Sequence, residues 1–500
     1  MIMPNFEFVH VDRPGDEKKH SSRIRRHVMK DIGRSRRKPK TCDETTTSRP
    51  TPIVAEGPSS RSQNQHDQAL VPSPLRECAI NDLVFPVEMD EERRNLARFL
   101  FAEARKTYLP LRIPWLSVGM SDPAAWHITV ANTELFRKMK PGDVKPEYNT
   151  DMDALKWYTM SLQSISRRLV DPNERGKEGL MGAIVGFICH DTSTGNFSRQ
   201  EIHLNGLKRL VDGIGGINEI TNPMLRFLIS WHDLTGAAYR NRLPIFGVPK
   251  DSITNIDTKN DTIYFKMLLD SWNRSCPYLG DIRSALQATA AVASYVNQHC
   301  KTPSFWMDDM MAVRLLVPAL HEVLSLEGRA LPSSPSDPVY SGTAAREAFR
   351  RSLLIFLASL KAKFGVANFE LNRHLKDFQQ ISKIPHVDWA LVPELSLWAH
   401  TIAALQAEGD GRSWHISAIV SIMESAGFTS SQQALDVVRG MIWVEALFVD
   451  KVETLCHEID DLVASNTIHR LSRIPIDPQL IEPMNLLGDE APLQNDFEVI

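Results

Sequence analysis

The sequence predicts an all-α protein, in which a large multi-helix domain follows a disordered basic arm and a disordered linker. Apolar residues recur at three- and four-residue steps along most of the chain after residue 85, the pattern of helices with one buried face. No run alternates between apolar and polar residues over a length that would indicate a core strand. A chain of 500 residues with 43% hydrophobic residues is long enough to bury a sizeable core.

Positive charge is concentrated at the N-terminus. Residues 1–40 contain twelve Lys and Arg and five Asp and Glu, which gives them a net charge of +7. The whole chain has a net charge of −4, so residues 41–500 together carry −11. Residues 23–37 have helical periodicity, with Ile24, Val28 and Ile32 on one face. A basic helix of this kind can contact phosphates, an import receptor, an acidic membrane surface or a partner's groove. The candidate residues for nucleic-acid binding or nuclear import are Arg23, Arg25, Arg26, Lys30, Arg34, Arg36 and Arg37.

Composition divides the chain into a basic arm (1–40), a disordered linker (41–85), a helical domain (86–475) and an acidic flexible tail (476–500). The linker is rich in Ser, Thr, Pro, Gln and Asn and has few large apolar residues, so it is not expected to form a core. After Arg473 no basic residue remains, and acidic residues are mixed with leucines. This tail resembles an activation segment, but its composition favours a plain disordered terminus.

Cysteine spacing and hydropathy exclude several classes of protein. No apolar run approaches the roughly 20 residues of a membrane helix, and no signal-peptide core is present. We therefore expect a soluble, intracellular protein with no membrane partner. No C-x-x-C pair, G-x-S-x-G elbow or Walker A pattern occurs, so no metal, cofactor or catalytic residue is expected. The six scattered cysteines are predicted to be reduced thiols, namely Cys42, Cys78, Cys189, Cys276, Cys300 and Cys456.

The stretch 179–249 predicts three helices joined by tight turns. Residues 180–189 are apolar nearly all round, which is typical of a helix buried inside a bundle. Ser198 and Glu201 have the spacing of a capping box that would begin the second helix. Asn222 as N-cap and Pro223 at the first helical position would begin the third. The second helix is expected to end at the glycines Gly213, Gly215 and Gly216, which follow a helix and therefore predict a helix stop and not a phosphate-binding loop.

The rest of the domain shows further helical patterns. Residues 109–115, with two prolines, are predicted to connect two helices, and 140–150 and 250–260 to be loops. Thr429 and Gln432 have the spacing of a second capping box. The predicted helices cover residues 91–108, 122–139, 151–170, 262–272, 282–300, 308–326, 344–363, 389–407, 414–425, 430–449 and 451–464.

Three motifs in the stretch 179–249 carry a resemblance to a known family. They are His203-Leu-x-Gly-Leu-x-x-Leu-Val-x-x-x-Gly-Gly216, Trp231-x-Asp233 and Pro244-x-Phe246. Together they resemble the fungal-specific transcription factor domain. The distal run Pro393-Glu-Leu-x-Leu-Trp398, followed by Trp414 and Trp443, is similar to the C-terminal part of that domain. At the N-terminus, Phe8-Val-x-Val11 and Ile24-Arg-x-His-Val-Met29, followed by Arg36 and Arg37, resemble the basic opening of a subgroup of these proteins.

The resemblance implies an α-helical regulatory region, transcriptional regulation in the nucleus, and other transcription regulators as partners. Most members of the family carry a zinc cluster of six closely spaced cysteines, and this chain lacks that spacing. Sequence-specific recognition through a zinc cluster is therefore not expected. The basic arm could contact DNA by itself, and the alternative is a helical interaction scaffold that never contacts DNA.

One enzymatic hypothesis stands beside these. His203, the His232-Asp233 dipeptide and Asp270 have the order of the metal ligands in all-α HD-type phosphohydrolases, where a divalent metal activates water. The competing interpretation is a set of core and surface side chains, because the same dipeptide also occurs by chance at His190-Asp191.

Overall fold

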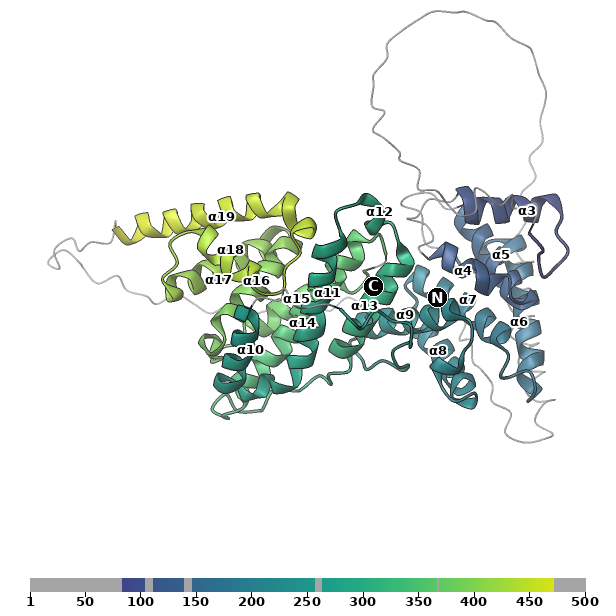
Figure 1. Ribbon diagram of the computed structural model, residues 1–500, viewed down its shortest axis with the longest axis horizontal. Coiled ribbons are helices and arrows are strands. Elements are labelled where there is room, and N and C mark those ends of the chain that lie inside the picture. Colours follow the sequence, from purple (N-terminus) through teal and green to yellow (C-terminus); the bar gives the residue numbers. More distant parts are fainter. Residues whose placement is uncertain (1–82, 104–110, 139–145, 257–262, 367, 472–500) are drawn as a thin grey trace, which may run out of the picture.

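The computed structural model describes residues 83–103, 111–138, 146–256, 263–366 and 368–471 (Figure 1). Within these ranges the chain forms helices and turns and no strand, which confirms the predicted all-α class. No helix of the described ranges combines the length and the apolar character needed to cross a bilayer. The basic arm and the acidic tail lie outside the described residues.

The first group of helices, on the right of Figure 1, packs around the stretch that carries the family motifs. Helix α5 packs on α6 and α7, α7 on α8, and α9 contacts α4 and α7. The glycines Gly182 and Gly186 let α7 approach α4 and α5, because a Cβ at either position would lie within 3.0 Å of Val118 or Ile128. The helices are α3 (Glu91–Arg98), α4 (Arg112–Gly119), α5 (Pro123–Arg137), α6 (Met152–Val170), α7 (Glu178–Thr194), α8 (Phe197–Gly213) and α9 (Pro223–Arg240).

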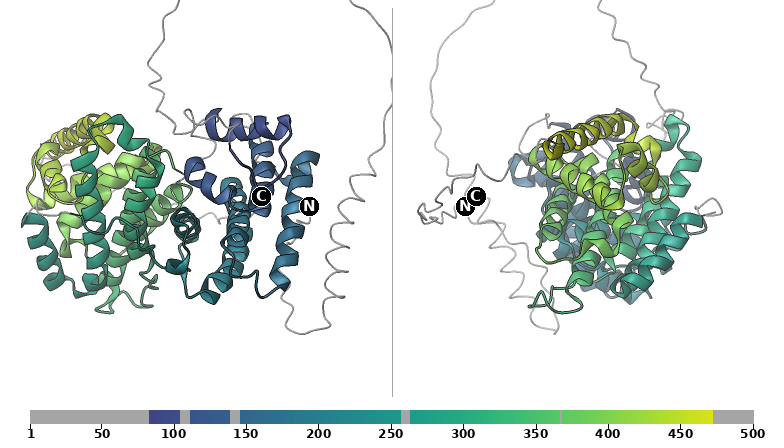
Figure 2. Two further views of the ribbon diagram at one scale, coloured as in Figure 1. Left: turned by 45° about the vertical axis from the view of Figure 1, so that its right-hand side comes forward. Right: turned by 90° about the vertical axis from the view of Figure 1, so that its left-hand side faces the viewer.

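The second group surrounds a central helix, α14, and meets the first group where α13 packs on α9 (Figures 1 and 2). Every residue of α14 from Gly342 to Lys361 is buried. Helix α19 lies on the outside of this group, over α16, α17 and α18 (Figure 2). The helices are α10 (Ile263–Ser275), α11 (Arg283–His299), α12 (Pro303–Trp306), α13 (Asp309–Leu324), α14 (Tyr340–Lys363), α15 (Leu371–Ser382), α16 (Pro393–Gln406), α17 (Gly409–Ala426), α18 (Ser431–Arg439) and α19 (Glu445–Leu471).

The predicted signals at the ends of α8 and α9 are confirmed. Asn222 Oδ1 accepts the amides of Met224 and Leu225 at the start of α9, and Pro223 takes the first helical position. At the end of α8, Gly215 and Gly216 have φ of 101° and 108°, a conformation that side-chain-bearing residues rarely adopt.

Both predicted capping boxes are wrong. Helix α8 begins at Phe197, one residue before Ser198, because Asn196 accepts the amide of Arg199 and is the N-cap. At the start of α18, Thr429 donates its amide to the side chain of Gln433, so Gln432 takes no part in capping.

Several predicted boundaries also need correction. Residues 112–119 form α4, because Leu111 in a left-handed conformation (φ 66°) starts a helix in which Pro114 lies within the first turn. The predicted helix 430–449 is interrupted after α18, and its second part joins residues 451–464 in the long helix α19. Helix α15 was not predicted, although Leu371, Leu375 and Phe378 give it an apolar stripe.

Buried charges tie α14 to its neighbours. Arg346 lies 3.0 Å from Asp281, Arg350 lies 3.0 Å from Glu347, and Arg351 lies 3.4 Å from Asp377. Arg350 also donates to the side chain of Asn241, the C-cap of α9, at 2.8 Å. Because an unpaired charge inside a protein is strongly destabilising, each of these groups requires its partner to be in place.

A buried ion pair joins three helices at the junction of the two groups. Lys361 of α14 lies 2.6 Å from Glu370, the N-cap residue of α15, and both side chains are only 1% exposed. The same ammonium lies 5.1 Å from the ring centre of Trp231 in α9, within the range of a cation–π contact. The position of the first group relative to the second therefore depends on this charge.

Replacing Glu370 with Gln is expected to lower the free energy of unfolding by about 3 kcal/mol, because the buried Lys361 ammonium loses its counter-charge. Asp212→Asn is the matched control: it breaks the Lys208–Asp212 pair, whose side chains are 37% and 54% exposed, and should change stability by less than about 0.5 kcal/mol. Denaturant unfolding monitored by circular dichroism measures both. Equal, small changes in the two variants would show that the buried pair does not hold the junction.

Candidate functional site

The seven cationic side chains of the predicted arm site lie outside the described residues, so the site stays a prediction. They are Arg23, Arg25, Arg26, Lys30, Arg34, Arg36 and Arg37. The described residues allow a test of the other candidate chemistry, namely the HD-type metal site, carboxylate clusters, histidine pairs and thiols.

The two histidines of the HD-type hypothesis have separate partners inside the first group. His203 Nδ1 lies 3.0 Å from Asp191 Oδ2, and Asp191 is itself paired with Arg199. His232 lies between α7 and α9, with Nε2 3.1 Å from the Cys189 sulfur and Nδ1 3.0 Å from the Thr192 hydroxyl. Burial lowers the pKa of His232 to about 4, so the ring is neutral at physiological pH.

The two aspartates of the HD-type hypothesis, Asp233 and Asp270, also have other partners within the fold. Asp233 Oδ2 accepts the amides of Ile245 and Phe246 at 2.6 and 2.9 Å, and Oδ1 accepts from Arg242 at 3.2 Å. Asp270 is half-exposed and lies 2.7 Å from Arg283. The structure therefore does not bring the four predicted ligands together, and the metal-hydrolase hypothesis has no assembled site.

The contacts of Asp233 give a structural reason for two family motifs. Trp231-x-Asp233 lies on α9 and Pro244-x-Phe246 lies in the segment after it, and the Asp233 carboxylate holds that segment by its backbone amides. Burial raises the pKa of Asp233, while the two amides and Arg242 act in the opposite direction. The spacing of these motifs thus serves the fold.

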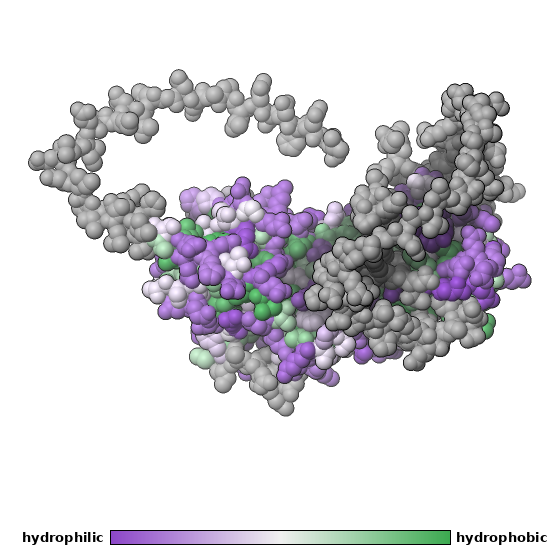
Figure 3. All heavy atoms as spheres, turned by 90° about the horizontal axis from the view of Figure 1, so that it is seen from above, coloured by the Kyte–Doolittle hydropathy of each residue, from purple (hydrophilic) through white to green (hydrophobic). Residues whose placement is uncertain are grey.

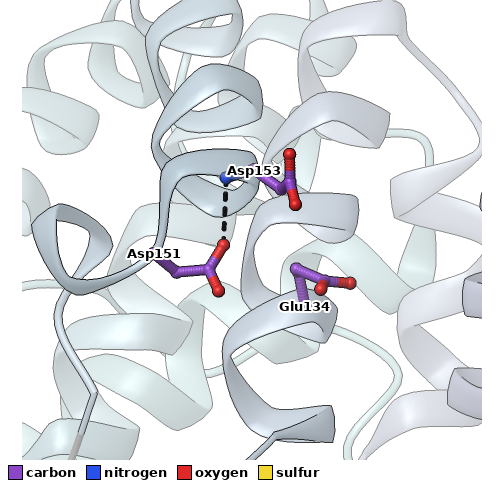
Figure 4. A group of neighbouring side chains, drawn as sticks. All are labelled: Glu134, Asp151 and Asp153. Atoms are coloured by element: carbon purple, nitrogen blue, oxygen red, sulfur yellow. Dashed lines mark hydrogen bonds between the residues drawn. The ribbon is translucent and has the colours of Figure 1, made fainter. Parts of the chain in front are cut away.

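One group of acidic side chains lies close enough to resemble a cation site, formed by Glu134, Asp151 and Asp153 (Figure 4). Lys138 Nζ lies 2.6 Å from both Glu134 and Asp151, and Arg137 adds a second cation at 3.0 Å from Glu134. Asp151 is also the N-cap of α6 and accepts the Asp153 amide at 3.0 Å. Two of the three carboxylates, Glu134 and Asp151, are thus paired with cations of the chain itself, and nothing at the group indicates a metal.

A pair of buried histidines lies between α16 and α17. His400 Nδ1 and His415 Nδ1 are 3.1 Å apart, so one ring donates to the other, and Phe378 of α15 stacks on His415 at 5.5 Å between ring centres. Burial and the neighbouring ring lower the pKa of His400 to about 3. Burial and Lys383 lower the pKa of His415 to about 4. Both rings are neutral in the folded protein near pH 7.

The buried thiols Cys189 and Cys276 do not have the environment of a nucleophile. Burial raises the pKa of Cys189 to about 12 and also raises the pKa of Cys276, so both stay protonated. The four cysteines of the described ranges are free, and they are Cys189, Cys276, Cys300 and Cys456.

The main polar feature that sequence reasoning missed is the row of buried arginines in α14. Arg346, Arg350 and Arg351 are 1%, 2% and 8% exposed. Their sequence spacing alone predicts a solvated face, because only the tertiary structure shows that Asp281, Glu347 and Asp377 accompany them. Their partners fix them as part of the core.

The depressed pKa values of the histidines make stability depend on pH. A histidine whose pKa is lower in the folded state than in the unfolded chain stabilises the fold above its unfolded value, near 6.5, and loses that contribution as the pH falls. Each of His232, His400 and His415 should therefore remove about 1.4 kcal/mol per pH unit below 6.5, down to its folded pKa.

We predict that His415→Gln reduces the loss of unfolding free energy between pH 7 and pH 5 by about 2 kcal/mol relative to the unmodified chain. The control is His299→Gln, which replaces an exposed ring and should leave the pH dependence unchanged. Denaturant unfolding at each pH measures the difference. A pH dependence that is the same in all three proteins would contradict the neutral buried state of His415.

Comparison with known proteins adds one match. A profile of the fungal specific transcription factor domain matches residues 94–446, from α3 to the start of α19. No curated protein and no solved structure matches this chain. The match covers more than half of the chain, and it includes the three motifs of residues 203–246 and the distal tryptophan motifs. The chain therefore belongs to the fungal-specific transcription factor domain family.

Proposed function

We propose that this protein is a transcriptional regulator that acts in the nucleus, with a helical domain that serves as a regulatory and interaction scaffold. The observation that carries the proposal is the family match over residues 94–446, which spans almost the whole folded domain. The candidate chemistry in the described ranges supports it, since the histidines, acids and arginines discussed above are paired within the fold. No catalytic role is assigned to the domain.

The basic arm is the proposed site of nuclear import and of contact with DNA phosphates. Its seven cationic side chains lie within fifteen residues, 23–37, and Lys and Arg at such density bind nucleic acid by releasing counterions. Without a zinc-cluster cysteine pattern the arm offers little sequence discrimination. Selection of target genes is therefore proposed to depend on other transcription regulators that bind the helical domain.

The proposed roles are assigned to separate segments of the chain. The arm (1–40) is connected by the linker (41–85) to the helical domain (86–475), and the acidic tail (476–500) follows. A second candidate function is a scaffold that acts in the same complexes without contacting DNA. Salt dependence separates the two, because phosphate contacts are lost as salt is added and apolar protein contacts are not.

For the full chain we predict DNA binding with a slope of log Kobs against log salt of about −4 to −6, as expected when five to seven cations displace counterions. Replacing all seven arm cations with Gln should abolish the slope and the binding. The matched control is Gln at seven exposed cations of the helical domain, which should retain both: Lys156, Arg167, Lys266, Arg274, Lys301, Lys376 and Lys383. Binding by the arm variant equal to that of the full chain would refute the assignment.

Nuclear import is measured separately on the same proteins fused to a fluorescent protein. The arm variant should be evenly distributed between cytoplasm and nucleus or excluded from the nucleus, and the control variant should accumulate in it. Nuclear accumulation of the arm variant would contradict the role of the arm in import. It would not affect the conclusion about DNA binding.

A further inference from the structure

The C-terminal helices carry a negative charge that the rest of the helical domain does not share. Residues 408–465 contain three Lys and Arg against ten Asp and Glu, a net charge of −7. Residues 86–407 contain 37 Lys and Arg against 34 Asp and Glu, a net charge of +3. The excess acid is therefore confined to α17, α18 and α19, at one end of the domain (Figure 1).

Part of this charge forms a stripe along the outer face of α19. Asp450, Glu453, His457 and Asp461 follow one another at steps of three, four and four residues, which places them on one side of a helix. Asp450, Glu453 and Asp461 are exposed, and within the described ranges no side chain forms an ion pair with them. We call these four residues the α19 stripe. Figure 3, which views the molecule from the side that α19 covers, shows a largely hydrophilic surface with hydrophobic patches.

Apolar side chains lie at one end of the α19 stripe. Val449, next to Asp450, is 56% exposed, and Leu447 is half-buried. The other acids of the helix already have partners within the fold, since Glu445 binds Arg439 and Glu458 binds Arg412. The α19 stripe is thus an outer helix face with uncompensated negative charge, and Val449 and Leu447 lie on either side of its N-terminal end.

The basic arm has the complementary pattern. Arg23, Arg26, Lys30 and Arg34 follow one another at the same steps of three, four and four residues, and they lie on one side of the predicted arm helix. Ile24, Val28 and Ile32 form an apolar stripe on the opposite side of the same predicted helix. Two parallel helices with this matched spacing can lie side by side with three of the four arm cations facing an acid of the α19 stripe, while Lys30 faces His457.

We propose that the basic arm, residues 23–37, docks on the α19 stripe of its own chain, so that the helical domain holds the arm when no nucleic acid is bound. The docked arm would place Arg23, Arg26 and Arg34 against Asp450, Glu453 and Asp461. The docking itself is independent of DNA binding. Its regulatory consequence, competition between the α19 stripe and phosphates for the same cations, rests on the proposed function.

The linker is long enough for this contact. Residues 38–82 span about 150 Å when fully extended and about 35–40 Å as a flexible coil. Helix α19, with 27 residues, is itself about 40 Å long. Tethering through such a linker supplies an effective concentration on the order of 1 mM, at which even a weak electrostatic contact is populated.

Limited trypsin digestion of the full chain tests the docking, with cleavage after Arg23, Arg26, Lys30 and Arg34 measured by mass spectrometry. The variant Asp450→Asn, Glu453→Gln and Asp461→Asn should be cleaved in the arm about tenfold faster than the unmodified chain at low ionic strength. At about 1 M salt, where the screening length is about 3 Å, the two should be cleaved equally fast. The matched control neutralises three other exposed carboxylates, with Glu91→Gln, Glu92→Gln and Glu322→Gln, and should be protected like the unmodified chain.

Equal arm cleavage in the unmodified chain and the stripe variant at low ionic strength would overturn the proposal. Faster cleavage in the control variant as well would also overturn it, because the effect would then come from net charge. Protection that increases with protein concentration would place the arm on a second copy of the chain, which contradicts an intramolecular contact.

A DNA titration of the same proteins separates this inference from the proposed function. If the arm binds DNA, the stripe variant should bind it several-fold more tightly than the unmodified chain, and the control variant should not. If no variant binds DNA while the arm is protected, the docking stands and the phosphate contact is lost. A stripe variant that binds DNA no more tightly than the unmodified chain would show that the α19 stripe does not compete for the arm.

Discussion

The structure depends on a helix that is buried on all sides and yet carries several charges. Helix α14 places Arg346, Arg350, Arg351 and Lys361 inside the domain. Acids outside α14 pair with Arg346, Arg351 and Lys361, and Arg350 pairs with Glu347 of α14 and donates to Asn241 of the first group. Because a charge without a partner in the interior is strongly destabilising, these pairs restrict which helices can surround α14. The Lys361–Glu370 pair, with Trp231 over the ammonium, extends that restriction to α9 and thus to the first group.

The same principle explains why side chains that suggest catalysis in the sequence are structural. A carboxylate or imidazole in a catalytic site is arranged so that it can reach a substrate. In contrast, the Asp233 carboxylate accepts hydrogen bonds from two backbone amides, and the His232 ring is hydrogen-bonded to Cys189 and Thr192. His400 and His415 are hydrogen-bonded to each other. A stripe of uncompensated acids lies on the outer face of α19, and the sequence places a matching run of cations on the arm. Both suit recognition of charged partners more than chemistry.

Much of the fold follows from local signals in the sequence. The Asn222-Pro223 start of α9, the glycines after α8 and the apolar face of α7 each act within a few residues, so a reader of the sequence finds them. The capping residue of α8 was misassigned because Asn196 and Ser198 are both good N-caps two residues apart, and only the backbone path decides between them. The two prolines of residues 109–115 predict a connection, but the short helix α4 forms there because Pro114 lies in its first turn, where proline is tolerated.

The candidate site was less accessible, since distant residues decide the environment of each group. The sequence around Asp233 does not show that the backbone amides of residues 245 and 246 will donate to its carboxylate. Likewise, the sequence around Arg346 does not show that Asp281 will be its ion-pair partner. The acidity of residues 408–465, in contrast, can be counted in the sequence, but a division into residues 1–40 and the remainder does not reveal it. The measurement that tests the central claim most directly is chromatin occupancy of the full chain in its native host. A nuclear regulator should be recovered at discrete promoter regions, and recovery at background level throughout the genome would contradict the proposed role in transcription.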